Sequence, residues 1–340
     1  MERAAAQRHK MPTLEDVARV AGVSRATVSR VIRNDPTSSE QARKLVEEAV
    51  AQTGYVPNRL ARSLVTRTTD AVAVVVAEPD ETVFNDPFFA TTIAGIAAGL
   101  EGAHKHLSLL MGGSNSQRNL DTYLRGGYAD AVILVSHHGD DRLLNQIIEA
   151  DIPFALIGRP INHHLDTCYV DTDNELGAYL ATSHLISRGC RRIALINGPQ
   201  NMGVSIDRRK GYELALAENN LTSAADLTGN FTPEGAQAAI LAALESGIRF
   251  DGLFIASDLM AAAVIPVLKR SGFDVPRQVK IVGFDDSRIA VVTTPQLTTI
   301  TNPSRALGEG AAAMVLKQLR GGTVAEPMII RPQLNQRESA

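Results

Sequence analysis

Two short helices joined by a tight turn are predicted by the stretch from Thr13 to Val31, TLEDVARVAGVSRATVSRV. Thr13, followed three positions later by the acidic Asp16, is typical of a helix N-terminus. Gly22 ends the first helix because glycine readily takes the positive φ of a C-terminal cap, and Ser24 caps the second helix. The pattern indicates a helix-turn-helix, whose second helix enters the major groove of DNA, with a plain helical hairpin as the alternative.

The rest of the N-terminal region is helical and then polar. A third helix is predicted over about residues 39–53, with Gly54 as its end. The segment 59–64 is too short to form a stable helix alone, and the polar residues 66–70 have the composition of a linker. Residues 1–68 hold 12 Lys and Arg against 7 Asp and Glu, whereas the remaining residues hold 22 against 30. This asymmetry favours a nucleic-acid-binding head, with a chance surface excess as the alternative.

Length and composition exclude several classes of protein. A chain of 340 residues exceeds one small domain, and 44% apolar with 21% charged residues is ordinary for a soluble globular protein. No apolar run approaches the roughly 18 residues of a membrane span, and the first dozen residues lack the apolar core of a secretory signal. Cys168 and Cys190 form no C-x-x-C motif. We therefore expect a cytoplasmic protein without a disulfide framework or a structural zinc site.

The region after residue 70 alternates short apolar runs with longer amphipathic segments, a pattern typical of parallel α/β sheets. The predicted strands are too numerous for one comfortable sheet, so we expect two lobes. A late helix at 303–319 and an extended segment at 326–334 complete the chain. The predicted strands are Ala71–Ala77, Leu107–Met111, Ala131–Val135, Phe154–Ile157, Arg192–Ile196, Gly252–Ala256 and Lys280–Gly283.

Two motifs connect this chain with a known family. The first, D-V-A-x-x-A-G-V-S-x-x-T-V-S-R-V, runs from Asp16 to Val31, and the second, G-Y-x-P-N-x-x-A-R-x-L, runs from Gly54 to Leu64. With these motifs the chain closely resembles the LacI/GalR family of bacterial transcriptional regulators, and the resemblance continues to about residue 336.

The resemblance implies an α/β protein with an N-terminal all-α helix-turn-helix domain and a hinge helix. A two-lobed, periplasmic-binding-protein-like α/β domain with parallel sheets would follow. The implied parts are an N-terminal tail at 1–12, the helix-turn-helix domain at 13–56, the hinge helix and linker at 57–69, and an effector-binding and dimerisation domain at 70–340. In that domain one lobe would comprise about 70–172 with 301–325, and the other about 173–300 with 326–340.

The second helix of the helix-turn-helix supplies most of the candidate DNA contacts. Its small hydroxyl residues suit contacts to phosphates, whereas Arg25 and Arg30 can reach base edges. The resemblance implies that Arg25, Ala26 and Arg30 read the bases. The candidates in this region are Thr13, Ser24, Arg25, Ala26, Thr27, Ser29 and Arg30.

The segment after Gly54 supplies the remaining DNA contacts. The resemblance implies a hinge helix that folds on DNA in the dimer, with Leu64 wedged into the minor groove beside Ala61. An apolar wedge that unstacks a base step is a known way to bend DNA, and an ordinary packed leucine is the alternative. Asn58 and Arg59 complete the candidates in this segment.

The resemblance also implies a small-molecule effector bound between the lobes. Phe88 and Phe89 open a predicted helix, where they either meet the effector or pack into the core. Arg208 suits a clamp on a carboxylate, a phosphate or a sugar diol, with a surface arginine as the alternative. Acidic residues that follow strands lie where α/β folds place ligands, although Asp258 also suits a helix cap. The candidate effector-binding residues are Phe88, Phe89, Asp173, Arg208, Phe231, Asp258 and Asp285.

Two other classes of protein find little support. An enzyme such as a dehydrogenase needs a cofactor fingerprint, but the chain contains no G-x-G-x-x-G, G-x-x-x-x-G-K-[ST] or G-x-S-x-G motif. A transport receptor would need a signal peptide, which we do not find here, and would lack the basic N-terminal region that this chain has. Paired histidines such as His137 and His138 have no further ligands at metal spacing, so we expect neither a metal nor a cofactor.

We therefore predict an effector-controlled DNA-binding regulator, a repressor by family default, and not an enzyme. It would act as a homodimer on palindromic operator DNA, without contact to a membrane. A sugar, a sugar phosphate and a nucleoside-like molecule all fit the candidate residues, with sugars favoured by family frequency. The sign of the response, induction or corepression, stays open.

Overall fold

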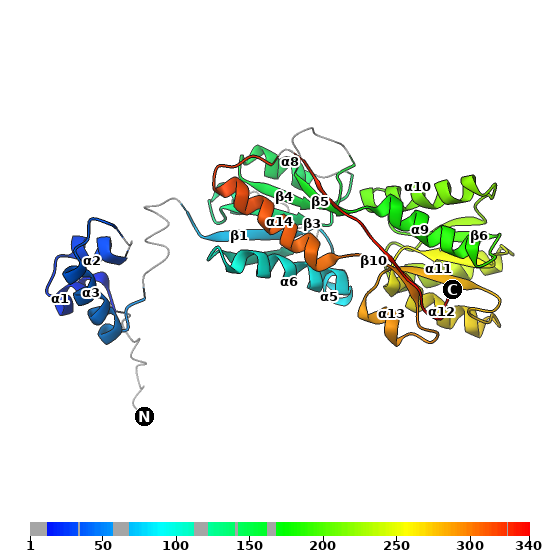
Figure 1. Cartoon of the computed structure of the whole chain (residues 1–340), viewed down its shortest axis with the longest axis horizontal. Coiled ribbons are helices and arrows are strands. Elements are labelled where there is room, and N and C mark those ends of the chain that lie inside the picture. The colour runs from blue at the N-terminus through cyan, green and yellow to red at the C-terminus, as the bar shows by residue number, and fades with distance from the viewer. Residues whose placement is uncertain are drawn as a thin grey trace, which may run out of the picture. The chain divides into compact units, whose positions relative to one another are not determined.

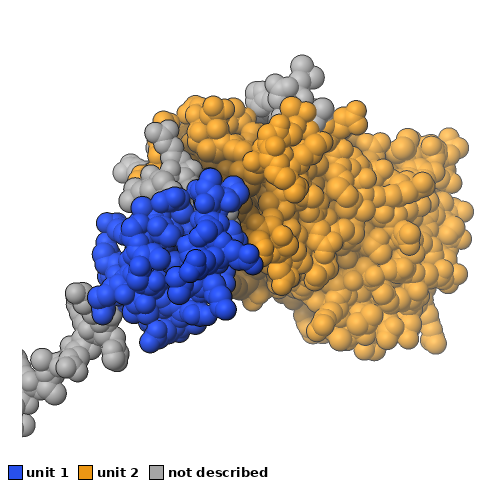
Figure 2. All heavy atoms as spheres, turned by 60° about the vertical axis from the view of Figure 1, so that its left-hand side comes forward, with its two compact units in different colours: residues 1–69 blue, residues 70–340 orange. Residues whose placement is uncertain are grey.

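Figure 1 shows the computed structural model with its helices and strands labelled. The chain divides into two compact units, residues 1–69 and residues 70–340, which Figure 2 draws in different colours. Each helix in the described part of the chain is too short or too polar to cross a bilayer. The described residues are 12–32, 35–56, 68–111, 122–139, 142–161, 168–324 and 326–340.

The first unit contains α1 (Leu14–Ala21), α2 (Arg25–Ile32) and α3 (Glu40–Thr53). The predicted start of α1 is confirmed, because the Thr13 hydroxyl accepts the Asp16 N–H at 3.3 Å and the Asp16 carboxylate accepts the Thr13 N–H at 2.9 Å. Gly22 takes a φ of 67° and ends α1, so that α2 can turn back across it. The helices share a small apolar core of Val17, Ala21, Val28, Val31, Val46, Ala49 and Tyr55.

The second unit has two lobes, and the first is built on a parallel sheet. Its strands are β1 (Ala71–Val76), β2 (His106–Met111), β3 (Ala131–Val135), β4 (Phe154–Ile157), β5 (Tyr169–Thr172) and β11 (Met328–Ile330), and its helices include α5 (Asp80–Asn85), α6 (Pro87–Glu101), α8 (Arg142–Glu149) and α14 (Ser304–Leu319). The strand order is β11-β5-β4-β3-β1-β2. Alternate residues of β1 point to opposite faces: Val74 packs with α6 and α14, whereas Val75 packs with α8.

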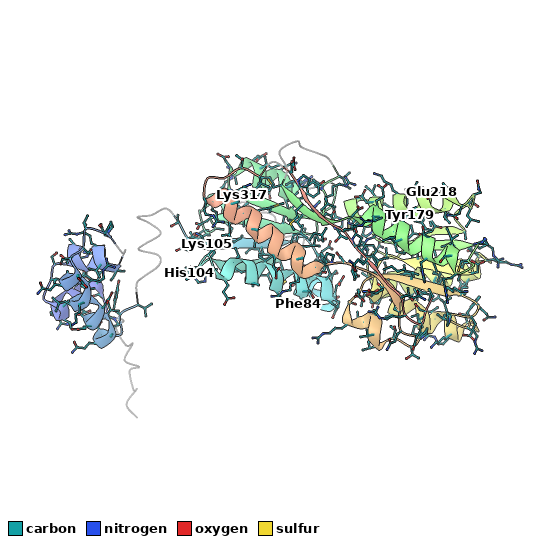
Figure 3. All side chains as sticks on the ribbon, in the orientation of Figure 1. Phe84, His104, Lys105, Tyr179, Glu218 and Lys317 are labelled. Atoms are coloured by element: carbon teal, nitrogen blue, oxygen red, sulfur yellow. The ribbon has the colours of Figure 1, made fainter. Side chains whose placement is uncertain are left out.

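The second lobe repeats this plan. Its strands are β6 (Ile193–Asn197), β7 (Ala225–Thr228), β8 (Gly252–Ile255), β9 (Lys280–Asp285), β10 (Thr298–Thr301) and β12 (Leu334–Asn335), and its helices are α9 (Asn174–Ser187), α10 (Gly203–Glu218), α11 (Pro233–Glu245), α12 (Asp258–Arg270) and α13 (Arg288–Val292). The order is β12-β10-β9-β8-β6-β7, with β12 antiparallel to β10. On one face α9 and α10 lie together, where the Tyr179 hydroxyl donates to Glu218 at 2.7 Å (Figure 3).

The chain passes between the lobes three times: after β5, after β10 and after β11. The last passage differs from the expected boundary at residue 326, because β11 still pairs with β5 in the first sheet. The chain therefore returns to the second lobe only after Ile330, where residues 331–333 lead to β12 (Figure 1). These passages place the carboxyl ends of both parallel sheets at the junction of the lobes, where α/β folds bind ligands.

Candidate functional site: a recognition helix and an interlobe cavity

The helix α2 presents a polar face opposite its buried residues. Val28 and Val31 point into the core, whereas Arg25, Ala26 and Arg30 are exposed. The exposed Arg25 side chain lies 3.0 Å from the Glu15 carboxylate of α1. Such exposed ion pairs contribute little to stability, so Arg25 can exchange this partner for a base or a phosphate.

The remaining candidates in this unit have mixed positions. The Ser24 hydroxyl accepts the Thr27 N–H at 3.1 Å and so caps α2, and it lies 2.9 Å from the Thr27 hydroxyl. Thr13 caps α1, and Ser29 is partly exposed beside Arg30. The hinge candidates Asn58, Arg59, Ala61 and Leu64 lie outside the residues that the structure describes.

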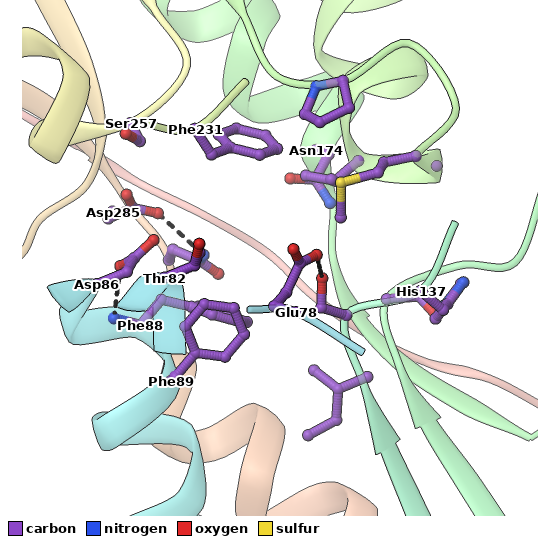
Figure 4. Close-up of a pocket in the computed structure, with 18 of the residues that line it drawn as sticks. Glu78, Thr82, Asp86, Phe88, Phe89, His137, Asn174, Phe231, Ser257 and Asp285 are labelled. Atoms are coloured by element: carbon purple, nitrogen blue, oxygen red, sulfur yellow. Dashed lines mark hydrogen bonds between the residues drawn. The ribbon is translucent and has the colours of Figure 1, made fainter. Parts of the chain in front are cut away.

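A cavity of about 310 Å³ lies between the two lobes of the second unit; we call it the interlobe cavity (Figure 4). Both lobes line it, mainly with residues that follow parallel strands or open helices. Five of the seven predicted effector-binding residues line this cavity. These five are Phe88, Phe89, Arg208, Phe231 and Asp285.

Arg208 is a buried arginine of the cavity that several neighbours hold in place. Its Nε donates to the Asn174 Oδ1 at 3.0 Å, and its Nη1 donates to the carbonyl of Ala256. The guanidinium also stacks on the Phe284 ring, 3.5 Å from the ring centroid. Burial lowers the pKa of Arg208 to about 10, although the surrounding carboxylates oppose this shift. Arg208 therefore stays charged at neutral pH and is held in one orientation before a ligand arrives.

Asp285 faces Arg208 from the end of β9. Its φ of 118° is strained for a residue with a side chain, and such strain gathers at functional sites. The Asn302 amide donates to its Oδ1 at 3.1 Å. Burial raises the pKa of Asp285 well above its ordinary value, whereas Arg208 lowers it. An arginine donor beside a carboxylate acceptor can bind adjacent hydroxyls of one ligand.

The phenylalanines form the apolar walls of the cavity. Phe88 and Phe89 open α6 and meet edge to face, with ring centroids 5.3 Å apart. Asp86 caps this helix by accepting the Phe88 N–H at 2.9 Å, and burial raises the pKa of its carboxyl group. Phe231 lies on the opposite lobe, with the Arg208 guanidinium 5.8 Å from its ring centroid. Phe88 and Phe89 therefore do both things that the sequence allowed: they pack against the core, and they line the cavity.

Two of the predicted effector residues lie elsewhere. Asp173 caps α9 by accepting the Leu176 N–H at 3.0 Å. Asp258 is fully buried and accepts the Ser287 N–H at 2.8 Å and the Thr299 hydroxyl at 2.6 Å. Neither lines the cavity. Each is next in the sequence to a lining residue, Asn174 or Ser257, which explains why motif position alone placed them in the site.

Several lining residues were missed from the sequence. Asp171 accepts N–H groups from Arg159 and Thr172 and the Asn174 amide at 2.7, 2.8 and 2.9 Å. Asn174 in turn accepts Arg208, so the three side chains form one chain of bonds. Acidic or amide residues at the end of a strand would have indicated Asp171 and Asn174, but β5 was not predicted as a strand. Further polar lining residues that the sequence motifs did not indicate include Glu78, Ser136, Arg159 and Asn302.

Bonds across the cavity rim join the lobes. Arg159, which follows β4, donates through Nε and Nη2 to both carboxylate oxygens of Asp207 on α10, each at 2.8 Å. Nearby, the Gly139 N–H donates to the Asn201 carbonyl at 2.7 Å. We call the Arg159–Asp207 pair the interlobe bridge. It spans the two lobes beside the cavity, so opening of the cavity on this side must break it.

The helix-turn-helix and the interlobe cavity together define a DNA-binding protein with a ligand-binding, two-lobed second domain. Comparison with known families agrees: residues 13–58 match the model of bacterial regulatory proteins of the lacI family, and residues 182–340 match a periplasmic binding protein-like domain.

Relatives cover nearly the whole chain. The HTH-type transcriptional regulator CelR of Thermobifida fusca is 39% identical over 339 residues, which are 98% of this chain and 99% of that protein. GalR of Escherichia coli K12 is 32% identical over 311 residues, 90% of this chain and 89% of that protein. The chain therefore belongs to the lacI family of bacterial regulatory proteins, and it is a DNA-binding transcriptional regulator rather than an enzyme.

Solved structures support the same fold. A CelR–cellobiose complex matches with a TM-score of 0.78 and 36% identity, over 97% of this chain and 100% of that chain. The lac repressor dimer bound to operator and the anti-inducer ONPF matches with a TM-score of 0.87, over 97% of this chain and 99% of that chain. Its identity of 24% supports the shared fold alone.

Proposed function

We propose that this regulator is a repressor whose affinity for operator DNA is controlled by a neutral sugar bound in the interlobe cavity. The observation that carries the proposal is the combination of phenylalanine walls with the buried Arg208 and the nearby Asp285 carboxyl group in one cavity. A sugar ring has apolar faces and a rim of hydroxyls, so it matches both parts of this lining. The repressor role itself follows the family default.

The charges of the cavity favour a neutral ligand over a sugar phosphate. Among the residues that the structure describes, four carboxyl residues line it, Glu78, Asp86, Asp171 and Asp285, against two arginines, Arg159 and Arg208. Arg159 is already bound to Asp207 through two bonds. Burial raises the pKa of Asp86, Asp171 and Asp285, and neighbouring carboxylates add to each shift. An anionic ligand would add negative charge where positive charge is already scarce.

A disaccharide of glucose is the first candidate within this class. A CelR that is 36% identical to this chain has been solved as a complex with cellobiose. A cavity of about 310 Å³ falls within the usual range of small-molecule sites, about 300–1,000 Å³. Cellobiose carries hydroxyls for the polar groups and sugar faces for the phenylalanine rings.

DNA binding follows from the first unit. We assign base reading to Arg25, Ala26 and Arg30 on the exposed face of α2, with a homodimer on a palindromic operator. The hinge residues, which lie outside the described part of the chain, would contact the minor groove between the half-sites. The protein would act in the cytoplasm, where its operator is.

A ligand panel tests the proposed function. The full chain is titrated with cellobiose, glucose, glucose 6-phosphate and a nucleoside while its unfolding temperature and heat of binding are followed. At 100 times its Kd, a bound ligand adds about 2.7 kcal/mol to the free energy of unfolding. We expect cellobiose to stabilise the protein and to change its operator affinity. Tighter binding of the phosphate or the nucleoside than of any neutral sugar would contradict the proposal.

A further inference from the structure

The carboxyl residues of the interlobe cavity are spread along it. Asp285 and Asp86 lie together in Figure 4, and the charge of Arg208 acts on both. Glu78 lies farther toward His137, although its charge still acts on Asp86. Glu78 comes two residues after β1, and its side chain is 16% exposed. Arg208 and Asp285 offer a donor and an acceptor to one sugar ring. Glu78 faces the same cavity from a position nearer to His137, which leaves it available to a second ring.

The Glu78 carboxylate is held in place by neighbouring side chains. Its Oε1 accepts the Ser136 hydroxyl at 2.6 Å and lies 3.0 Å from the His138 Nε2. Ser136 takes a φ of 57° at the end of β3, a costly conformation for a non-glycine residue. Pro79 follows Glu78 with a φ of −59°, which restricts the backbone on the other side. These contacts fix Oε1, and the bonds described for this side chain leave Oε2 for another donor.

We propose that Glu78 binds hydroxyls of the second ring of a neutral disaccharide and thereby sets the length of the effector. This inference rests on the proposed sugar-binding function. An ionised carboxylate only accepts hydrogen bonds, so its partner must be a donor such as a sugar hydroxyl. A charge-assisted bond of this kind is roughly twice as strong as a neutral one. The Arg208–Asp285 end holds the first ring, and Glu78 adds affinity that a single ring cannot use.

The residue Glu81 provides a matched control. It lies on α5, three residues from Glu78, but it is exposed and does not line the cavity. Glu78→Gln and Glu81→Gln therefore remove the same charge from neighbouring positions. Both variants are first checked for cooperative unfolding and for unchanged operator affinity without effector.

The test is calorimetric titration of the full-length protein with cellobiose and with glucose. We expect Glu78→Gln to weaken cellobiose binding about tenfold or more and to change glucose binding less than about threefold. Glu81→Gln should leave both affinities unchanged. Unchanged cellobiose binding in Glu78→Gln, or an equal loss for glucose, would overturn the inference while the sugar-binding function stands. A wild-type protein that binds neither sugar would overturn the proposed function itself.

Discussion

The side chain of Arg30 lies on the exposed face of α2. Its Nε lies 3.4 Å from the Ala26 carbonyl, a weak contact that does not commit the guanidinium. A guanidinium on this face can bind two acceptors of guanine in the major groove. Arg30→Ala should therefore cost about 1–3 kcal/mol of operator binding and relax the preference at one base pair of each half-site. Selection from random DNA followed by fluorescence anisotropy measures both effects.

The control for Arg30 is Arg19, which carries the same charge on α1 and pairs with Asp16 at 3.0 Å. Arg19→Ala should leave the preferred sequence unchanged. If Arg30→Ala weakens binding to all sequences equally, Arg30 contacts a phosphate and not a base.

The carboxyl group of Asp171 makes stability depend on pH. Burial raises its pKa from 3.8 to about 6, against hydrogen bonds from the Arg159 and Thr172 N–H groups that lower it. Between about pH 4 and 6 the folded protein thus keeps a proton that the unfolded chain releases. This contribution to stability is present at the acidic end and is lost as the pH rises through about 6. A shift of about two pKa units corresponds to about 3 kcal/mol.

Asp171→Asn removes this titration. Urea unfolding of both proteins from pH 4 to pH 7 should give a free-energy difference, wild type minus variant, that falls by on the order of 3 kcal/mol as the pH rises. The same difference at every pH would contradict the assigned titration.

Individual site residues were predictable where they carried a residue type with few alternative uses. Arg208 lies on α10 and Asp285 ends the recognisable strand β9, and both line the cavity. Asp173 and Asp258 had the same residue type and the same position after a strand, but their carboxylates satisfy backbone N–H groups instead. Sequence spacing predicts that a residue follows a strand, whereas the packing of the neighbouring loop decides which group its side chain contacts.

Among the elements, the predicted strands are those with continuous apolar runs. The strands that were missed carry polar or alternating residues: β5 reads Tyr-Val-Asp-Thr, β7 Ala-Asp-Leu-Thr and β10 Thr-Thr-Ile-Thr. The strand β7 lies at a sheet edge with alternate residues exposed, and β10 is stabilised by neighbours on both sides. Pairing with distant strands decides these elements, and a local pattern contains no such information.

The interlobe bridge joins two elements from different lobes, and it has a matched counterpart. Arg159 binds Asp207 across the lobes, whereas Arg209 lies 2.7 Å from Asp226 within the second lobe. Asp207→Asn should destabilise the closed cavity and weaken cellobiose binding about tenfold, because a partly buried arginine loses its partner. Asp226→Asn removes the same charge but should leave cellobiose affinity unchanged. Calorimetry on the two variants compares them directly.

An equal loss of affinity in Asp207→Asn and Asp226→Asn would show that the charge, and not the connection between lobes, supports binding. Small-angle scattering provides a second measurement. We expect Asp207→Asn without ligand to be more extended than the wild type, and cellobiose to reduce the difference.

At the scale of the whole molecule, the cavity lies entirely in the second unit and the recognition helix in the first. A ligand in one unit can change operator affinity only if it binds the DNA-binding and the free forms of the protein with different affinity. Thermodynamic linkage then makes the effect reciprocal. We expect coupling between the cavity and the operator because the chain belongs to a family of regulators. The coupling free energy can be measured at either site.

Equal coupling measured from the two sites is therefore the last prediction. The factor by which saturating cellobiose changes operator affinity should equal the factor by which saturating operator changes cellobiose affinity. Anisotropy and calorimetry measure the two factors. Two variants separate the sites. Asp285→Ala should remove the effector response, because ligand hydroxyls left unpaired cost about 1–3 kcal/mol each, and it should leave effector-free operator binding intact. Leu64→Ala should weaken operator binding and leave cellobiose affinity intact if its side chain is a minor-groove wedge. Unequal factors in the wild-type protein would show that a single coupled equilibrium does not connect the cavity with the operator.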